Sequence, residues 1–110
     1  MIQFGVQLAM HPPAEQFALV RRLEALGFDS VWTGDHVSFH NPLYESLTLL
    51  ATYASITERI KLGTAVYLLA LRTPAVAAKV TATLDVLSGG RLVFGVGVGN
   101  MPQAIQGKSL

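Results

Sequence analysis

Hydrophobic residues follow two patterns along the chain, short continuous runs and longer stretches with a helical period. The runs cover Ile2–Leu8, Ser30–Thr33, Ile60–Val66 and Arg91–Val98. Short apolar runs bounded by turn residues predict buried strands. Their first residues, at positions 2, 30, 60 and 91, lie about thirty residues apart. This regular spacing predicts one repeated structural unit.

Each interval between the runs carries start and stop signals of a helix. The start signals pair a cap or a proline with a proline at the first helical position. They are Pro12-Pro13, then Asn41-Pro42 with Glu45 in the first turn, and Thr73-Pro74. Gly27 predicts a left-handed end for the first helix, and Ser88-Gly89-Gly90 predicts the end of the third.

The three predicted helices each carry an apolar stripe with steps of three or four residues. Such a stripe predicts the face that packs on a sheet. The stripes consist of Phe17, Val20, Leu23 and Leu26; of Leu47, Leu50, Ala51 and Ala54; and of Val76, Val80, Leu84 and Leu87.

Strand, helix and strand at this spacing form the βαβ unit of parallel sheets, in either an open doubly wound sheet or an eight-stranded barrel. The dinucleotide-binding version of the open sheet requires glycines directly after its first strand, whereas Leu8–Pro13 contains none. The glycines at 95, 97 and 99 come after the start of the fourth strand and have no helix signal behind them. We therefore expect an α/β fold, a partial TIM (β/α)8 barrel with about four parallel strands and three helices.

The length of the chain limits this barrel to a half. A complete barrel requires about 250 residues, whereas the chain has 110. A half barrel leaves two strand edges unpaired and one sheet face uncovered. We therefore expect either a fragment or a homo-oligomer with the first and fourth strands at or near its interface.

Composition excludes several classes of protein. The chain is 51% hydrophobic and 14% charged, with a net charge of +1 and no long basic run, which argues against nucleic acid as a partner. No apolar stretch reaches the length of about 18 residues that a spanning helix requires. Residues 1–4 do not resemble a signal peptide, and there is no cysteine. A cytoplasmic protein acting on a small-molecule substrate is the expectation.

Polar residues follow each predicted strand, where parallel α/β folds bind their ligands. Asp35 and His36 come directly after the second strand, and a histidine there suits proton transfer near neutral pH. The alternative is that Asp35 caps a turn and His36 is solvated. A functional role is less expected for His11 and His40, because they lie on predicted loops. The other residues predicted at this rim are Gln7, Ala65, Val66, Tyr67, Arg72, Gly99 and Asn100.

The alternating glycines of "GVGVGN" would leave one face of the fourth strand without side chains. Such a face leaves room for a flat group or a close approach of backbone, and the alternative is tight packing against a helix. No residues have the spacing of metal ligands, and the G-x-S-x-G motif of a nucleophile elbow is absent.

Three segments together resemble the N-terminal half of the bacterial luciferase-like monooxygenase superfamily. They are "LEALGFDSVWTGDH", "TERIKLGTAV" and "TLDVLSGGRLVFGVGVG". The resemblance covers roughly residues 2–99 and is closest to members that use FMN or the deazaflavin coenzyme F420. It implies an eight-stranded α/β barrel that performs hydride transfer with the deazaflavin or the reaction of reduced FMN with oxygen.

The resemblance also implies roles for individual residues. Asp35 and His36 would lie at the coenzyme, with His36 as the proton acceptor. Ala65 and Val66 would form a bulge with a non-prolyl cis peptide behind the coenzyme ring. Val98 and Gly99 would border the coenzyme.

Residues 100–110 depart from the family, which continues with an acidic segment containing phenylalanine. This predicts a partial luciferase-like barrel over residues 1–99 and a non-family tail over 100–110. The resulting hypothesis is a truncated luciferase-like oxidoreductase. One alternative is a non-enzymatic half-barrel remnant that self-associates. Another is a half-barrel enzyme that binds phosphate at Gly97–Asn100.

Overall fold

The computed structural model describes residues 1–37 and 40–99. Within these residues it contains a four-stranded sheet, three α-helices and one 3-10 turn. In chain order they are β1 (Gly5–Gln7), α1 (Pro13–Ala25), β2 (Ser30–Thr33), α2 (Ser46–Ile56), β3 (Lys61–Leu68), η1 (Leu69–Leu71), α3 (Pro74–Leu87) and β4 (Leu92–Gly97).

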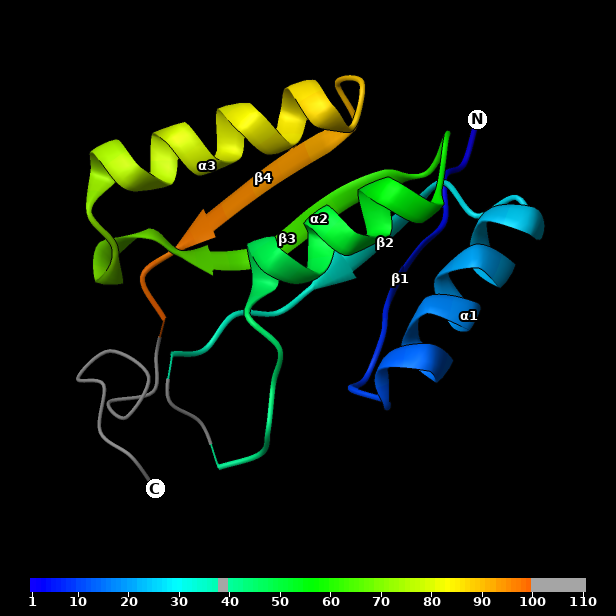
Figure 1. Ribbon diagram of the computed structural model, residues 1–110, viewed down its shortest axis with the longest axis horizontal. Coiled ribbons are helices and arrows are strands. Elements are labelled where there is room, and N and C mark those ends of the chain that lie inside the picture. Colours follow the sequence, from blue (N-terminus) through cyan, green and yellow to red (C-terminus); the bar gives the residue numbers. More distant parts are fainter. Residues whose placement is uncertain (38–39, 100–110) are drawn as a thin grey trace.

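The sheet is entirely parallel and its spatial order is the chain order, β1-β2-β3-β4. Parallel crossovers are almost always right-handed, so consecutive neighbouring strands place their helices on the same side of the sheet. Figure 1 shows α2 lying across β2 and β3, with α1 beside β1 and α3 along β4. The predicted α/β arrangement of four parallel strands and three helices is confirmed.

The predicted strands differ most from the structure at the first one. β2 has the predicted bounds, whereas β1 is shorter than Ile2–Leu8 because it pairs with β2 only from Gly5 to Gln7. Ile2 and Phe4 are 77% and 63% exposed, so the apolar run before β1 is not buried.

Two of the three helix starts are as predicted, and α2 is the exception. It begins at Ser46 and not after Asn41, so the prediction of a cap at Asn41-Pro42 is wrong. The carboxylate of Glu45 accepts hydrogen bonds from the backbone N–H groups of Leu47 and Thr48, at 3.2 and 2.8 Å. Glu45 therefore caps the helix, because its carboxylate satisfies N–H groups that have no partner inside the first turn.

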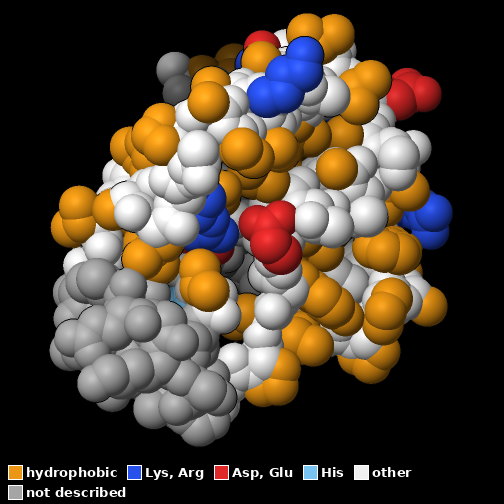
Figure 2. Space-filling view, turned by 60° about the vertical axis from the view of Figure 1, so that its left-hand side comes forward, with side chains coloured by type: hydrophobic (Ala, Val, Ile, Leu, Met, Phe, Trp, Pro, Cys, Tyr) orange, Lys and Arg blue, Asp and Glu red, His pale blue; other side chains and the backbone are white. Residues whose placement is uncertain are grey.

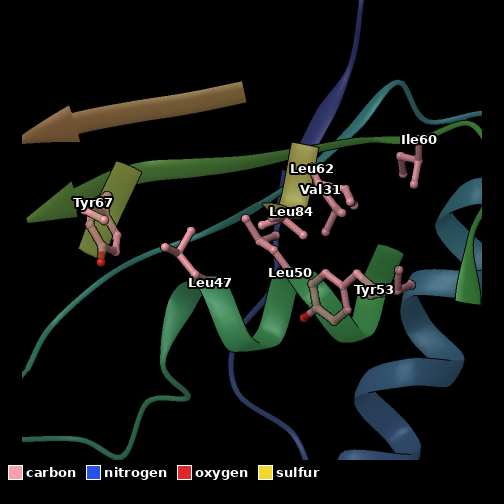
Figure 3. Close-up of a cluster of buried hydrophobic side chains, with 10 residues drawn as sticks. Val31, Leu47, Leu50, Tyr53, Ile60, Leu62, Tyr67 and Leu84 are labelled. Atoms are coloured by element: carbon pink, nitrogen blue, oxygen red, sulfur yellow. The ribbon is translucent and has the colours of Figure 1, made fainter. Parts of the chain in front are cut away.

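The hydrophobic core lies between the helices and the sheet. Figure 3 shows Leu47 and Leu50 of α2 directed toward Val31 of β2 and Leu62 of β3, with the ring of Tyr53 in the same cluster. Leu47 and Leu50 were predicted to be buried, whereas Tyr53 was not. Its hydroxyl accepts a hydrogen bond of 2.7 Å from Gln16 of α1, which satisfies a polar group inside the core.

The predicted stripe of α3 is wrong in all but one position. Leu84 is buried, whereas Val76, Val80 and Leu87 are 59%, 41% and 74% exposed. Ala77 is the second buried residue of this helix, so the packed face is rotated from the predicted one. A small side chain at the contact lets a helix lie close to its neighbours, and helical period alone cannot show this. Leu26 of the first stripe is also exposed, at 62%.

The opposite face of the sheet carries Trp32, whose indole lies across glycines of both neighbouring strands. A Cβ atom on Gly63 of β3 would overlap the indole, and one on Gly5 of β1 would lie 2.6 Å from its Nε1 atom. Nε1 donates a hydrogen bond of 2.8 Å to the Ser30 hydroxyl. Glycine at both neighbouring positions therefore gives the indole its place.

Arg91 occupies the amino end of the sheet, between the ends of two helices. Its side chain is buried and donates to the carbonyl oxygens of Ser88 (2.6 Å), Ala54 (3.1 Å), Thr57 (3.2 Å) and Ile60 (3.2 Å). It also donates to the Thr57 hydroxyl at 2.8 Å. The guanidinium group therefore joins the C-terminal ends of α2 and α3 to the start of β3.

Glu24 accepts hydrogen bonds from backbone N–H groups at the same end of the sheet. Its carboxylate accepts from the N–H groups of Glu58, Arg59 and Ile60, at 3.1, 2.8 and 2.9 Å. Burial would raise the pKa of Glu24, but these hydrogen bonds outweigh it and the pKa is lowered. The carboxylate thus fixes the loop between α2 and β3.

None of the helices within the described residues is both long and apolar enough to cross a membrane.

Candidate functional site

The third strand is irregular near its carboxyl end. The peptide bond between Ala65 and Val66 is cis, and the pairing with β4 skips from Thr64 to Tyr67. Both the cis bond and the bulge predicted there are confirmed. Ala65 and Val66 are exposed, whereas the flanking Thr64 and Tyr67 are buried. The bulge therefore presents a short stretch of backbone with small side chains at the surface.

Glycines of β4 make room for this bulge. A Cβ atom on Gly95 would overlap the carbonyl oxygen of Thr64, and one on Gly97 would lie 2.5 Å from Cγ2 of Val66. Of the two interpretations of the alternating glycines, the close approach of backbone is therefore correct at Gly95. The approaching element is the neighbouring strand and not a helix.

Asp35 lies at the end of β2 and is buried, with 5% of its surface exposed. Its Oδ2 atom accepts from the backbone N–H of Leu68 and from Nη1 of Arg72, each at 2.7 Å. Its Oδ1 atom accepts from Nη2 of Arg72 at 2.9 Å and from the Ser46 hydroxyl at 3.4 Å. One carboxylate therefore connects β2, the end of β3, the start of α2 and the segment after η1.

Arg72 is held on three sides. Its guanidinium group lies 4.2 Å from the ring centre of Tyr67, and Nη2 is 3.7 Å from the carboxylate of Glu45. Burial would lower the pKa of Arg72, but the hydrogen bonds and the charge of Asp35 outweigh it and the pKa is raised. Burial raises the pKa of the Tyr67 hydroxyl, and the charge of Arg72 offsets part of this rise. The cation and the neutral phenol thus form one compact group with Asp35.

His36 follows Asp35 directly and is half-buried. Because β2 delivers both residues to the carboxyl end of the sheet, His36 lies at the same end as the bulge of β3, as predicted. His11 and His40 lie on loops. Nδ1 of His11 is 3.5 Å from the carboxylate of Glu15.

The carboxyl end of β4 borders an open hollow of about 670 Å³. Its lining consists of Leu69, Ala70, Arg72, Pro74, Val96, Gly97 and Val98. Figure 2 views this end of the molecule and shows hydrophobic side chains over much of it, with a basic and an acidic side chain close together. Val98, one of the predicted coenzyme contacts, is 72% exposed, and Gly99 has a positive φ of 75°. Asn100, which belongs to the alternative phosphate site, lies outside the described residues.

Sequence reasoning missed the partnership between Asp35 and Arg72. It predicted both residues at the rim but assigned no role to the arginine. The signal was an arginine shortly after one buried strand and an acid directly after the neighbouring strand. The pair is separated by 37 residues, so only the pairing of β2 with β3 brings it together.

The chemistry of this end suits a planar aromatic group. Ala65, Val66 and Val98 offer exposed surface with small or branched apolar side chains, and His36 offers a group that can exchange protons. A phosphate group would find a less suitable partner in Arg72, because Asp35 already holds that guanidinium in a bidentate pair. Within the described residues, no cluster of three or more histidine, cysteine or acidic side chains could hold a metal ion.

Comparisons with known proteins identify a family and a fold that the chain shares. The family model described as luciferase-like monooxygenase matches residues 2–108. An F420-dependent glucose-6-phosphate dehydrogenase of Kineococcus radiotolerans is 38% identical over 107 residues, which cover 86% of this chain and 31% of the relative. The chain spans about 30% of the length of the first two curated relatives it matches.

Solved structures of larger proteins contain the same arrangement of strands and helices. A monooxygenase from Streptomyces bottropensis superposes with a TM-score of 0.83 at 30% identity, over 96% of this chain and 36% of that protein. The oxygenating constituent of 3,6-diketocamphane monooxygenase from Pseudomonas putida, solved in complex with FMN, gives a TM-score of 0.83 at 23% identity. That match covers 94% of this chain and 31% of the other, and it shows the fold alone. The fold is therefore a four-stranded part of a TIM barrel.

Proposed function

The chain belongs to the luciferase-like monooxygenase family, and on this premise we propose that it forms part of an oxidoreductase that uses FMN or the deazaflavin coenzyme F420. The observation that carries the proposal is the exposed bulge of β3 at Ala65 and Val66, which lies at the same end of the sheet as Asp35 and His36. The F420-dependent relative of Kineococcus radiotolerans supports the deazaflavin, and the resemblance of the sequence to the family supports FMN as the alternative. Titration with each coenzyme distinguishes FMN from F420.

Each group of described site residues would have its own role in binding or catalysis. Ala65 and Val66 would lie against one face of the coenzyme ring, and Val98 with Gly99 would border its edge. A bound coenzyme of this kind supplies the acceptor of a hydride or, as reduced FMN, the reactant for oxygen. His36 would accept the proton from a substrate hydroxyl while the adjoining carbon gives up a hydride.

A direct test is titration of the 110-residue chain with FMN and, separately, with F420. Saturable quenching of coenzyme fluorescence by one of them is the expected result. Val66→Lys serves as the matched variant, because it places a long charged side chain on the proposed contact surface at a position that is already 42% exposed. It should weaken binding without unfolding the chain. Absence of binding of either coenzyme, both to the unmodified chain and to a complete barrel that contains it, contradicts the proposal.

The role of His36 is tested in a complete barrel, in which a full-length relative supplies the remaining strands. There His36→Ala should lower turnover at least about tenfold, since general acid–base groups contribute about a hundred- to ten-thousand-fold. Coenzyme affinity should change little in this variant, whereas Asp35→Ala should weaken it, because the carboxylate of Asp35 holds the N–H of Leu68 beside the bulge. His11→Ala is the control. Turnover equal to that of the parent in the His36 variant would contradict a catalytic role and favour the alternative of a solvated histidine.

Self-association is a second proposal, and it rests on the sheet edges. Within the described residues, β1 pairs only with β2, and β4 pairs only with β3. Unpaired edges of this kind favour association with another chain. Sedimentation of the chain at micromolar concentration should show a dimer or a larger species. A folded particle with the mass of one chain contradicts this proposal and leaves the coenzyme proposal intact.

A further inference from the structure

We propose that Arg72 is a positioning residue, which acts through Asp35 to set His36 relative to the bulge of β3. The inference rests on the proposed function for its meaning, because that function makes His36 and the bulge two parts of one site. It reassigns Asp35 from a coenzyme contact to the link between them.

The carboxylate of Asp35 carries this link. Asp35 directly precedes His36, so its placement determines where the backbone of His36 lies. Its Oδ2 atom also accepts the N–H of Leu68 at 2.7 Å, and Leu68 follows Tyr67, the residue at which pairing resumes beyond the bulge. Any displacement of this carboxylate therefore changes the distance between His36 and the bulge.

Arg72 holds the carboxylate in its place. Both oxygens of Asp35 accept from its terminal nitrogens, at 2.7 and 2.9 Å, in a bidentate pair. Nη1 also donates to the carbonyl oxygen of Leu68 at 3.2 Å, so the arginine holds the same peptide segment that Asp35 holds. A planar guanidinium imposes this geometry, whereas a lysine would supply only a point charge.

The surroundings leave Arg72 little freedom. Its side chain is 17% exposed, its guanidinium lies over the ring of Tyr67 at 4.2 Å, and the Glu45 carboxylate lies 3.7 Å from its Nη2 atom. A general stabilising role would also explain a buried ion pair, so the test must separate local positioning from global stability.

Hydrogen exchange at two amide protons separates local positioning from global stability. The N–H of Leu68 donates to Asp35, and the N–H of Leu62 donates to the carbonyl oxygen of Arg91 at 2.9 Å, near the opposite end of the same strand. Local loosening at the carboxyl end accelerates hydrogen exchange at Leu68 alone, whereas global destabilisation accelerates both. The histidine ring signals report on His36, with those of His11 as an internal reference.

The experiment compares the unmodified 110-residue chain with Arg72→Met by nuclear magnetic resonance. Exchange at Leu68 should become at least about tenfold faster, because two charge-assisted hydrogen bonds are lost, while exchange at Leu62 changes by less than about twofold. The ring signal of His36 should move, and that of His11 should not. Arg59→Met, which removes an exposed arginine at the amino end, should leave the His36 signal in place.

Arg72→Lys keeps the proposal testable if Arg72→Met does not fold. The lysine retains the charge but not the planar fork, so it should also accelerate exchange at Leu68 and move the His36 signal. Equal acceleration at Leu62 and Leu68, or an unchanged His36 signal in the folded variant, overturns the proposal. These readings require no coenzyme, so a failure of FMN and F420 to bind would overturn the proposed function alone.

Discussion

The two ends of the sheet each use a buried charged side chain to gather groups from several elements, but they do so differently. At the amino end, Arg91 donates to carbonyl and hydroxyl oxygens of residues 54–60 and 88. At the carboxyl end, Asp35 faces a full opposite charge on Arg72 and a single backbone N–H. The carboxyl end of the sheet also carries exposed Ala65, Val66 and Val98.

Helix ends explain how Arg91 is satisfied by neutral oxygens. The last carbonyl groups of a helix have no partner within it and carry partial negative charge. Arg91 reaches such groups at the end of α2 and just after α3, at Ala54 and Ser88. At the amino end, oxygen atoms of the fold itself therefore satisfy the buried arginine. The carboxyl end keeps residues exposed, which is where barrels of this type place their active sites.

Arg91→Met is the change expected to separate the two ends most strongly. It leaves several buried carbonyl oxygens without a donor, and each such group costs about 1–3 kcal/mol. We expect the free energy of unfolding to fall by about 3 kcal/mol or more, measured by urea denaturation. Arg59→Met is the control, since Arg59 is exposed and its guanidinium donates to the carbonyl groups of Glu24 and Phe28, and it should cost less than about 1 kcal/mol. Equal losses in both variants would contradict the special role of the buried arginine.

Gly95→Ala tests the carboxyl end without touching a charge. The added methyl group would overlap the carbonyl oxygen of Thr64, so the backbone of β3 must move. Such overpacking costs about 1–3 kcal/mol, and it should also weaken binding of FMN or F420, because the bulge is displaced. Gly97→Ala is the matched variant, in which the new contact is a methyl group of Val66 and not backbone. A larger loss of stability in Gly97→Ala than in Gly95→Ala would contradict this prediction, because it would show that the backbone of the bulge moves at little cost.

Glu24→Gln gives a smaller expected effect and concerns the amino end. The pKa of Glu24 is lowered from its ordinary value of 4.5, so its contribution to stability is complete above that value and is lost as the pH falls through the lower, folded-state pKa. At pH values near neutrality the variant should be less stable by about 1 kcal/mol, because three backbone N–H groups lose a charged acceptor. The difference from the unmodified chain should shrink toward zero in acid. Urea denaturation at both pH values checks this, and a difference independent of pH would contradict it.

Glu45 provides the comparison at the carboxyl end. Burial would raise its pKa, but hydrogen bonds from Thr48 and Leu47 outweigh it, so its pKa is lowered too. Glu45 lies beside Arg72 and its side chain is 49% exposed. Solvent screens a group of this exposure, so we expect Glu45→Gln to change the acid dependence less than Glu24→Gln does.

Much of the fold was predictable from local signals. Short apolar runs predicted the four strands, prolines and glycines predicted both ends of α1 and α3, and the resemblance predicted the bulge at Ala65 and Val66. These signals lie within a few residues of the feature that they predict. The roles of Asp35 and His36 at a coenzyme stay predictions.

Only the tertiary structure decided which distant residues meet. The Asp35–Arg72 pair and the Gln16–Tyr53 hydrogen bond each join residues 37 positions apart, and both depend on how strands pair and helices cross the sheet. The buried face of α3 and the cap at Glu45 likewise followed from packing and hydrogen bonding and not from period or preference. The sequence by itself determined the elements and their order, because those arise from neighbouring residues. The contacts that position the candidate site arise from strand register, which no local pattern contains.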